Sequence, residues 1–201
     1  KLSGASQTEL VLQAGTGALT RFARNQIHQN MSSRDMRLSV RVVERQGIGF
    51  AETNLFDADS LKQTIDWALQ VARAGRIPAQ PPDLPSPQEY EELKNFFERT
   101  AVFSPADRAE LARGIIEKSG AAGAEAAGAV SNSSDTIAIV NSNGLRAFHA
   151  LTGANFTATV SAEKSTGWCD CTAADVSSLD AEERGGRALE RRDGEAAHPA
   201  A

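Results

Sequence analysis

The 201-residue chain has little cysteine, few aromatic residues and no long apolar run. Its two cysteines, Cys169 and Cys171, are too few for the disulfide framework of a small secreted protein and favour a reducing compartment. No stretch of about 18 successive apolar residues is present, so the sequence contains no typical membrane span. The first residues also lack the apolar run of a signal peptide. We therefore expect a cytoplasmic protein.

The sequence also lacks the short motifs that mark common active sites. It contains no Gly-x-Ser-x-Gly, no phosphate-binding glycine loop, no dinucleotide fingerprint and no His-Glu-x-x-His. Its histidines, His28, His149 and His198, are scattered, and the Cys169-x-Cys171 pair has no second pair with which to form a structural zinc site. We therefore expect no catalytic residue, no metal ligand and no cofactor site in this chain, and we expect the cysteines and His149 to be structural.

Hydrophobic residues make up 41% of the chain and charged residues 23%, which is typical of a globular protein with one sizeable core or two small ones. The formal net charge of -5 argues against a protein built mainly to bind nucleic acid. The stretch 21–45 is nevertheless rich in arginine. Three interpretations of this stretch are open. In order of preference they are a solvated sheet face, a protein or peptide contact surface, and a nucleic-acid surface. The candidate contact residues are Arg21, Arg24, His28, Arg37 and Arg41.

One pattern occurs twice in the sequence, at a constant offset. Each copy has a glycine and an aromatic residue, then an aspartate, a serine and a leucine: Gly49, Phe50, Asp57, Ser60 and Leu61 in the first, and Gly167, Trp168, Asp175, Ser178 and Leu179 in the second. We expect a duplicated unit in which a strand ends, a short loop follows and an aspartate caps a helix. Both aspartates are therefore expected to be caps and not catalytic carboxylates.

Alternating and β-branched runs predict the strands. Leu38, Val40 and Val42 alternate with polar residues, which predicts a sheet with one dry and one wet face. Turns are expected at 15–17, at 46–47 and at Asn143-Gly144. The strands expected between the turns and helices are 8–14, 18–23, 27–31, 37–45, 48–53, 126–131, 136–141, 144–151, 155–162 and 167–172.

Helices are expected from the Asp57 cap to about Gly75, over 104–119 and from the Asp175 cap onward. Five prolines between 78 and 87 predict a segment without regular structure. Together these signals predict an α+β fold: one antiparallel sheet built from two duplicated strand-rich units with flanking helices. The domain is expected to span 1–190, with repeat units of about 1–76 and 104–190, a proline-rich crossing over 77–103 and a flexible tail over 191–201. The partner of the 104–119 helix is expected mostly upstream of residue 1.

Four segments carry a resemblance to a known family. They are the run from Ala18 to Asn30, the strand Leu38–Val43, the run Gly49–Asn54 and the turn Asn141–Leu145. In this order, together with the proline-rich crossing and the Gly-Trp-Cys segment, they resemble the N-terminal half of the TldD/PmbA family, also called modulators of DNA gyrase. The first hairpin is more similar to PmbA (TldE) than to TldD.

The resemblance implies a cytoplasmic peptidase system of two related subunits that cleaves unfolded peptides. In that family the zinc-binding His-Glu-x-x-x-His motif belongs to the C-terminal half of TldD-type chains, and nothing in this sequence matches it. The resemblance therefore implies a scaffold that forms part of a substrate chamber and of a homo- or heterodimer interface, with zinc held by the absent C-terminal half or by a partner subunit. The alternative is a non-enzymatic protein- or nucleic-acid-binding module that uses the arginine-bearing sheet face.

Overall fold

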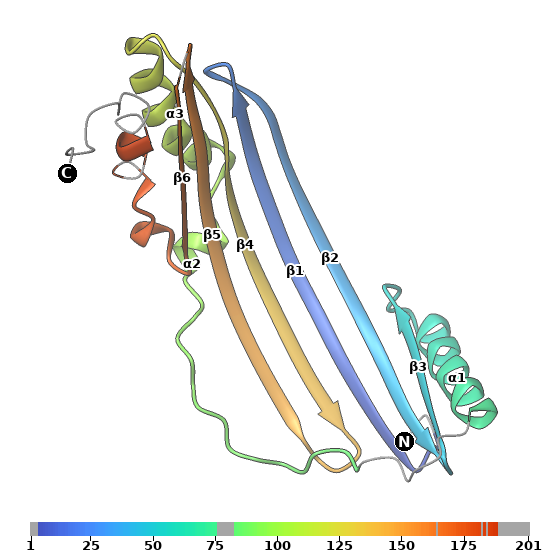
Figure 1. The fold of residues 1–201 in the computed structure, drawn as a ribbon. Helices are drawn as coiled ribbons and strands as arrows, with labels where there is room; N and C mark the ends of the chain where they lie inside the picture. Colours follow the sequence, from blue (N-terminus) through green and yellow to red (C-terminus); the bar gives the residue numbers. More distant parts are fainter. Residues whose placement is uncertain (1–3, 76–82, 164, 182, 184, 189–201) are drawn as a thin grey trace, which may run out of the picture. The chain divides into compact units, whose positions relative to one another are not determined.

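The computed structural model describes residues 4–75, 83–163, 165–181, 183 and 185–188. Six strands form one antiparallel sheet in the order β3-β2-β1-β4-β5-β6 (Figure 1). The α+β class predicted from the sequence is confirmed. The elements are β1 (Gln7–Ala23), β2 (Gln26–Glu44), β3 (Gly47–Thr53), α1 (Ala58–Ala74), α2 (Glu98–Ala101), α3 (Pro105–Ala121), β4 (Glu125–Asn141), β5 (Arg146–Ala162), β6 (Ser165–Ala173) and a 3-10 turn, η1 (Val176–Ser178).

The predicted breaks inside the long strands are wrong. The expected pairs of short strands are instead continuous in β1, β2, β4 and β5, which have 17 to 19 residues each. The hairpin predicted at 15–17 lies inside β1, where Gly17 has no positive φ and is part of the strand. All four strands have a neighbour on both sides in the sheet order, so the pairing overrides the weak strand propensity of glycine and serine.

The duplication is visible in the pairing register. Val42 pairs with Gly49 at the β2–β3 edge, and Val160 pairs with Gly167 at the β5–β6 edge, so the same offset relates both pairs. A Cβ on Gly49 would lie 1.8 Å from the carbonyl oxygen of Ala68, and a Cβ on Gly167 would lie 1.8 Å from that of Ala188. Each glycine therefore permits a helix backbone to approach the edge strand at closer range than a side chain allows.

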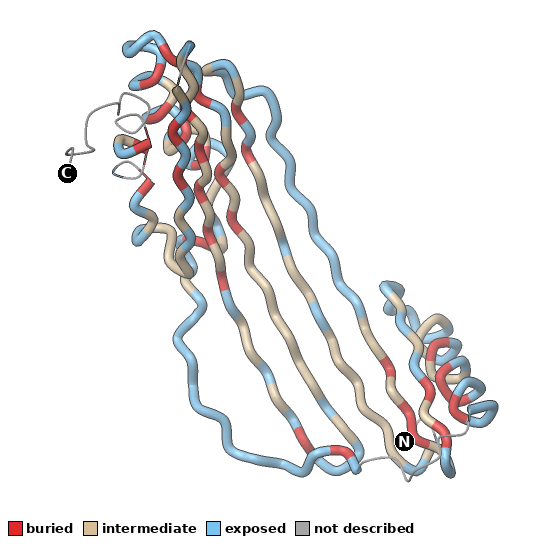
Figure 2. Tube along the Cα trace, in the orientation of Figure 1, coloured by how far each residue is buried: buried red, intermediate tan, exposed pale blue. Residues whose placement is uncertain are grey.

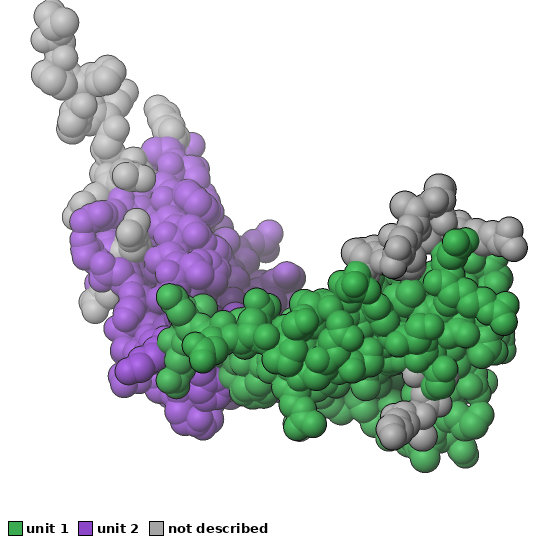
Figure 3. All heavy atoms as spheres, turned by 90° about the horizontal axis from the view of Figure 1, so that it is seen from below, with its two compact units in different colours: residues 1–15, 34–93, 135–150 green, residues 16–33, 94–134, 151–201 purple. Residues whose placement is uncertain are grey.

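The chain forms two compact units, coloured separately in Figure 3. Unit 1 comprises residues 1–15, 34–93 and 135–150. In this unit α1 packs on β3 and on the end of β2. Figure 2 shows buried residues on α1 and on the strands that it covers. The Asp57 carboxylate caps α1 by accepting from the Ser60 amide at 2.9 Å, as predicted. The buried core residues are Val40, Val42, Ala68, Leu69 and Ala72.

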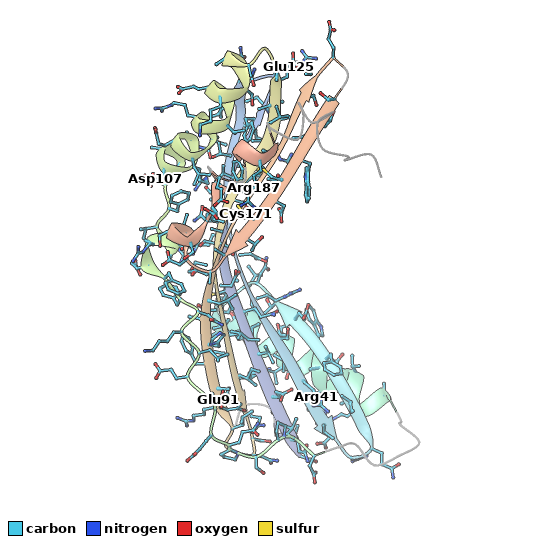
Figure 4. All side chains as sticks on the ribbon, turned by 60° about the vertical axis from the view of Figure 1, so that its left-hand side comes forward. Arg41, Glu91, Asp107, Glu125, Cys171 and Arg187 are labelled. Atoms are coloured by element: carbon cyan, nitrogen blue, oxygen red, sulfur yellow. The ribbon has the colours of Figure 1, made fainter. Side chains whose placement is uncertain are left out.

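Unit 2 comprises residues 16–33, 94–134 and 151–201. Its core is formed by residues of α3 and by buried residues of β1, β4, β5 and β6. Ser104 and Asp107 form a reciprocal capping box at the start of α3, with Pro105 in the first turn, so the predicted 104–119 helix is confirmed (Figure 4 labels Asp107). The larger buried side chains of this core are Phe22, Ile115, Val130, Phe156 and Val160.

The last predicted helix differs from the structure. Asp175 accepts from the Ser177 amide at 3.0 Å, but it caps the single turn η1 and not a long helix. Helical residues resume at Ala181. The segment 83–97 has no regular structure, in agreement with its prolines, whereas residues 76–82 and the predicted tail 191–201 lie outside the described residues. Among the described helices, none has the length and apolar character required to cross a membrane.

Candidate functional site

A hollow of unit 2 lies on one face of the sheet, and we name it the sheet pocket. It has a volume of about 510 Å³. Five strands contribute to it: residues 17–19 of β1, 31–33 of β2, 131–133 of β4, 153–155 of β5, and Thr172 of β6. The volume falls within the range of ligand pockets, about 300–1,000 Å³.

Missing side chains create the hollow. A Cβ on Gly17 would meet Ser33 Oγ at 3.5 Å, and a Cβ on Gly153 would meet Ser133 Oγ at 3.4 Å, which are ordinary contacts. Both glycines therefore leave space that a larger residue would fill without steric conflict at its Cβ. The residues that line the pocket carry no ionisable side chain: they are glycine, alanine, serine, threonine, asparagine, leucine and methionine.

The amide of Asn155, in the pocket lining, has three hydrogen-bond acceptors on β6. Its Nδ2 donates to Asp170 Oδ1 at 2.9 Å, to Thr172 Oγ1 at 2.9 Å and to the Cys171 carbonyl at 3.2 Å. These contacts join β5 to the edge strand β6 and fix the amide of Asn155. The Asp170 carboxylate is engaged in the same network and does not line the pocket.

Arg108 lies on the other side of the same strands. Only 1% of its surface is exposed. The guanidinium donates to Thr20 Oγ1 at 3.1 Å, to Asn30 Oδ1 at 3.1 Å, to Asn132 Oδ1 at 2.8 Å and to the Phe103 carbonyl at 2.7 Å. Asn132 also belongs to the lining of the sheet pocket. Since side chains alternate along a strand, Thr20, Asn30 and Asn132 are expected to direct their side chains to the face opposite that of Leu19, Met31, Ser131 and Ser133.

All four acceptors of the Arg108 guanidinium are neutral. Burial disfavours the charged form and lowers the pKa of Arg108 from its ordinary value, while the Asp107 carboxylate nearby offsets part of that effect. The Arg108 cation is therefore buried behind the floor of the sheet pocket, and its hydrogen-bond acceptors among the described residues are neutral oxygens. Arg108 was not among the residues predicted from the sequence, because an arginine in the first turn of a helix has no distinguishing signal.

The five predicted contact residues are divided between the two compact units. Arg21, Arg24 and His28 belong to unit 2, where Arg21 donates to Gln29 Oε1 at 3.4 Å and Arg24 occupies the β1–β2 turn with φ 52. His28 is exposed. Arg37 and Arg41 belong to unit 1. The role of all five as partner contacts stays a prediction.

Arg37 and Arg41 have acidic neighbours on the polar face of unit 1. Arg37 lies 3.6 Å from Glu52. Arg41, labelled in Figure 4, lies 3.8 Å from Glu9, and its guanidinium is 5.9 Å from the centre of the Phe50 ring. Arginines paired with carboxylates on a sheet face agree with the first of the three interpretations of the arginine-rich stretch, a solvated sheet face. Nucleic-acid binding is not favoured, because these carboxylates would oppose a phosphate backbone.

Three carboxylates of the described residues serve as caps of helical turns. Three carboxyl groups, those of Asp57, Asp107 and Asp175, have pKa values below the ordinary value, owing to hydrogen bonds from Ser60, Ser104 and Ser177 respectively. Within the described part of the chain, no group of three or more His, Cys, Asp or Glu residues is placed to hold a metal ion. Cys169 is buried and Cys171 is half-buried, whereas His198 lies outside the described residues.

Comparisons with known proteins identify the architecture. Residues 8–72 match the model of PmbA/TldA metallopeptidase domain 1, and residues 84–192 match that of the PmbA/TldA metallopeptidase central domain. No curated protein matches the sequence.

Three solved structures share the fold. TldE from Thermococcus kodakarensis is 18% identical with a TM-score of 0.85, covering 94% of this chain and 44% of that protein. A proposed modulator of DNA gyrase from Thermotoga maritima is 15% identical with a TM-score of 0.78, covering 93% and 44%. Another from Bacteroides thetaiotaomicron is 17% identical with a TM-score of 0.79, covering 94% and 46%.

This chain therefore spans less than half the length of those structures. The likeness in structure establishes the fold, and the two domain models together match most of the sequence in the expected order. The chain belongs to the PmbA/TldD family.

Proposed function

We propose that this chain is the N-terminal scaffold of a PmbA/TldD-type metallopeptidase system that acts on unfolded peptides in the cytoplasm. In this role it forms part of the substrate chamber and of a subunit interface, and it does not hydrolyse peptides by itself. The observation that carries the proposal is the sheet pocket, a broad hollow lined by neutral polar and apolar side chains, in a chain that matches the first and central domains of the family.

Hydrolysis then depends on atoms that lie outside this chain. A zinc-bound water is the usual nucleophile of a metallopeptidase, and the family resemblance assigns the zinc ligands to the C-terminal half of a TldD-type chain. We propose that zinc is held there, in the rest of a longer protein or in a partner subunit. The scaffold contributes a binding surface, which raises the local concentration of peptide at a distant zinc site.

A reconstitution assay tests the division of labour. The purified chain is incubated with an unfolded protein substrate and zinc, alone or with a TldD-type subunit that carries His-Glu-x-x-x-His. We expect no hydrolysis by the chain alone and chelator-sensitive hydrolysis in the mixture. Chelator-sensitive hydrolysis by the 201-residue chain alone would contradict the proposal.

The subunit interface is tested separately. Size-exclusion chromatography with light scattering measures the mass of the chain alone and after mixing with the TldD-type subunit. We expect either a homodimer or a heterodimer, since the proposed role places this domain at a subunit contact. A chain that stays monomeric under both conditions would remove the interface from the proposal.

A further inference from the structure

We propose that Trp168 and Asp170, on the edge strand β6, form a binding site for the guanidinium group of an arginine side chain in a peptide ligand. The proposal rests on the proposed function, since it takes the ligand to be a peptide, and it adds a preference for arginine that the family assignment does not contain. Two observations carry it: the duplication supplies an occupied copy of the same residue pair, and the pair is exposed in the second copy.

The duplicated pattern places an aromatic residue and an acidic residue on each edge strand. On β3 these are Phe50 and Glu52, and on β6, at the offset that relates the two edge glycines, they are Trp168 and Asp170. The members of each pair are two positions apart in a strand, so their side chains share one face of the sheet and lie about 7 Å apart along the strand. The glycine before each aromatic residue faces the helix, so the pair lies on the opposite face.

In the first copy, two arginines of the neighbouring strand β2 occupy this pair. The guanidinium of Arg41, the cross-strand partner of Phe50, lies 5.9 Å from the centre of the ring. A guanidinium nitrogen of Arg37 lies 3.6 Å from a carboxylate oxygen of Glu52. The face of an aromatic ring attracts a guanidinium, and a carboxylate forms an ion pair with it. The first copy therefore shows which chemical group this residue pair binds.

In the second copy, neutral residues replace both arginines. Asn155 stands at the position equivalent to Arg37. Its Nδ2 donates to Asp170 at 2.9 Å, a neutral contact that leaves the negative charge of the carboxylate uncompensated. Thr159 stands at the position equivalent to Arg41, and it is the cross-strand partner of the tryptophan. The second copy therefore keeps the aromatic residue and the acid but has lost the internal cations.

The pair on β6 is accessible to a ligand. Trp168 is 60% exposed, close to the 62% of its counterpart Phe50, and Asp170 is also exposed. The described residues place no lysine or arginine over the Trp168 ring and none in an ion pair with Asp170. Arginine suits this surface better than lysine, because its planar guanidinium is weakly hydrated, stacks on aromatic rings and donates to carboxylates through a fixed fork.

The location of the pair favours a peptide as the source of the arginine. Asp170 is two positions from Thr172 on the same face of β6, and Thr172 lines the sheet pocket. The carboxylate also accepts from Asn155, another residue of the pocket lining. The proposed arginine site therefore continues the surface of the sheet pocket along β6, within reach of a peptide that lies in the pocket.

Peptide titration monitored by NMR of the 15N-labelled chain tests the preference. The probe is the acetylated and amidated heptapeptide Gly-Ser-Ala-Arg-Ala-Ser-Gly, compared with the same peptide carrying citrulline, the neutral isostere of arginine, at the centre. We expect the arginine peptide to shift the amide signals of residues 157–159 and 167–172 and the indole N–H signal of Trp168. We expect the citrulline peptide to bind at least fivefold more weakly.

Two substitutions remove the parts of the site one at a time. Asp170→Asn removes the charge and keeps an oxygen that accepts from Asn155, whereas Trp168→Ala removes the ring. We expect at least threefold weaker binding of the arginine peptide to each, and Asp170→Asn should also reduce the difference between the two peptides. The matched control is Asp180→Asn, an exposed aspartate of unit 2 outside the strands, which should bind as the unmodified chain does. Circular dichroism verifies that each variant is folded.

A third substitution introduces the arginine of the first copy into the second. Thr159→Arg places a guanidinium opposite Trp168, as Arg41 stands opposite Phe50. We expect this internal arginine to occupy the ring and to weaken binding of the arginine peptide at least fivefold. The control Thr159→Gln adds a neutral side chain at the same position and should weaken binding less than twofold.

Three results would overturn the proposal: equal affinity for the arginine and citrulline peptides, undiminished binding by both folded variants that lack a part of the site, or no signal shift with the arginine peptide at millimolar concentration. Association with a TldD-type subunit that depends on Trp168 and Asp170, without binding of the arginine peptide, would assign the pair to the subunit interface and would also overturn it. Chelator-sensitive hydrolysis by the chain alone would contradict the scaffold role and leave the arginine site in place, so the two proposals fail separately.

Discussion

At the scale of single residues, Arg108 is the most consequential side chain of unit 2. It joins three strands and the segment that follows α2 through four hydrogen bonds, and its acceptors in the described part of the chain include no carboxylate. Removal of a buried donor leaves its acceptors without partners, and each unsatisfied acceptor costs about 1–3 kcal/mol. Arg108 therefore stabilises the floor of the sheet pocket as well as the core beneath it.

The substitution Arg108→Met should lower the free energy of unfolding by about 2–4 kcal/mol, because several buried oxygens lose their donor. Urea unfolding followed by circular dichroism measures the change. The matched control is Arg113→Met on the same helix, whose exposed ion pair with Glu110 predicts a change of less than about 0.5 kcal/mol. Equal effects of the two substitutions would show that the Arg108 network contributes little.

The Asp107 carboxyl also permits a prediction about pH. Hydrogen bonds from Ser104 lower its pKa in the folded state, so its contribution to stability is present above the unfolded value of 3.8 and is lost as the pH falls through the folded value. We expect Asp107→Asn to be less stable than the unmodified chain at pH 7 and the difference to shrink below pH 3.8. A difference in unfolding free energy that stays constant from neutral pH to well below the folded pKa would contradict this assignment.

At the scale of elements, the duplicated unit is an edge strand that carries a helix at short range. The glycine in each copy pairs with a valine of the neighbouring strand, and each lies close to a helix carbonyl oxygen. This packing explains why glycine occurs in both copies when many other positions differ. The helices themselves are not equivalent, since Asp57 begins α1 directly whereas Asp175 begins only the turn η1.

The substitutions Gly49→Ala and Gly167→Ala should each destabilise the chain by about 3 kcal/mol or more, because the new methyl group would overlap a helix carbonyl oxygen. The control Gly114→Ala lies in open space within α3 and should stabilise the chain by about 0.5–1 kcal/mol. Thermal unfolding of the three variants measures these effects. Tolerance of alanine at both edge-strand positions would refute the packing role of the glycines.

At the scale of the whole molecule, the four long strands contribute residues to both compact units. Neither unit is a continuous segment of the chain, and each contains segments from both halves of the sequence. We expect these shared strands to couple the folding of the two units. If one unit unfolded alone, each long strand would lose its inter-strand hydrogen bonds over part of its length, so we expect a single cooperative transition.

The two tryptophans permit a test of this coupling, since Trp67 lies in unit 1 and Trp168 in unit 2. Both are exposed, so Trp67→Phe and Trp168→Phe should each preserve the fold. Urea unfolding of the two single-tryptophan variants, followed by fluorescence, should give coincident transitions that also agree with circular dichroism. Separate midpoints would show that the units unfold independently.

The sequence alone was sufficient for the local structure. The caps at Asp57 and Ser104, the turn at Gly144 and the alternation around Val40 and Val42 are set by neighbouring residues, so all four were predicted correctly. The duplicated register and the family resemblance also came from the sequence. These features depend on contacts within a few positions or on pattern, which the chain displays without being folded.

Only the tertiary structure decided the lengths of the strands, the sheet pocket and the buried position of Arg108. The strands run through residues such as Gly17 and Ser131–Ser133 because neighbouring strands supply hydrogen bonds that local propensity does not reveal. The pocket exists because small residues from five strands meet at one level of the sheet. That coincidence depends on the register between segments far apart in the chain, and no single stretch of sequence contains it.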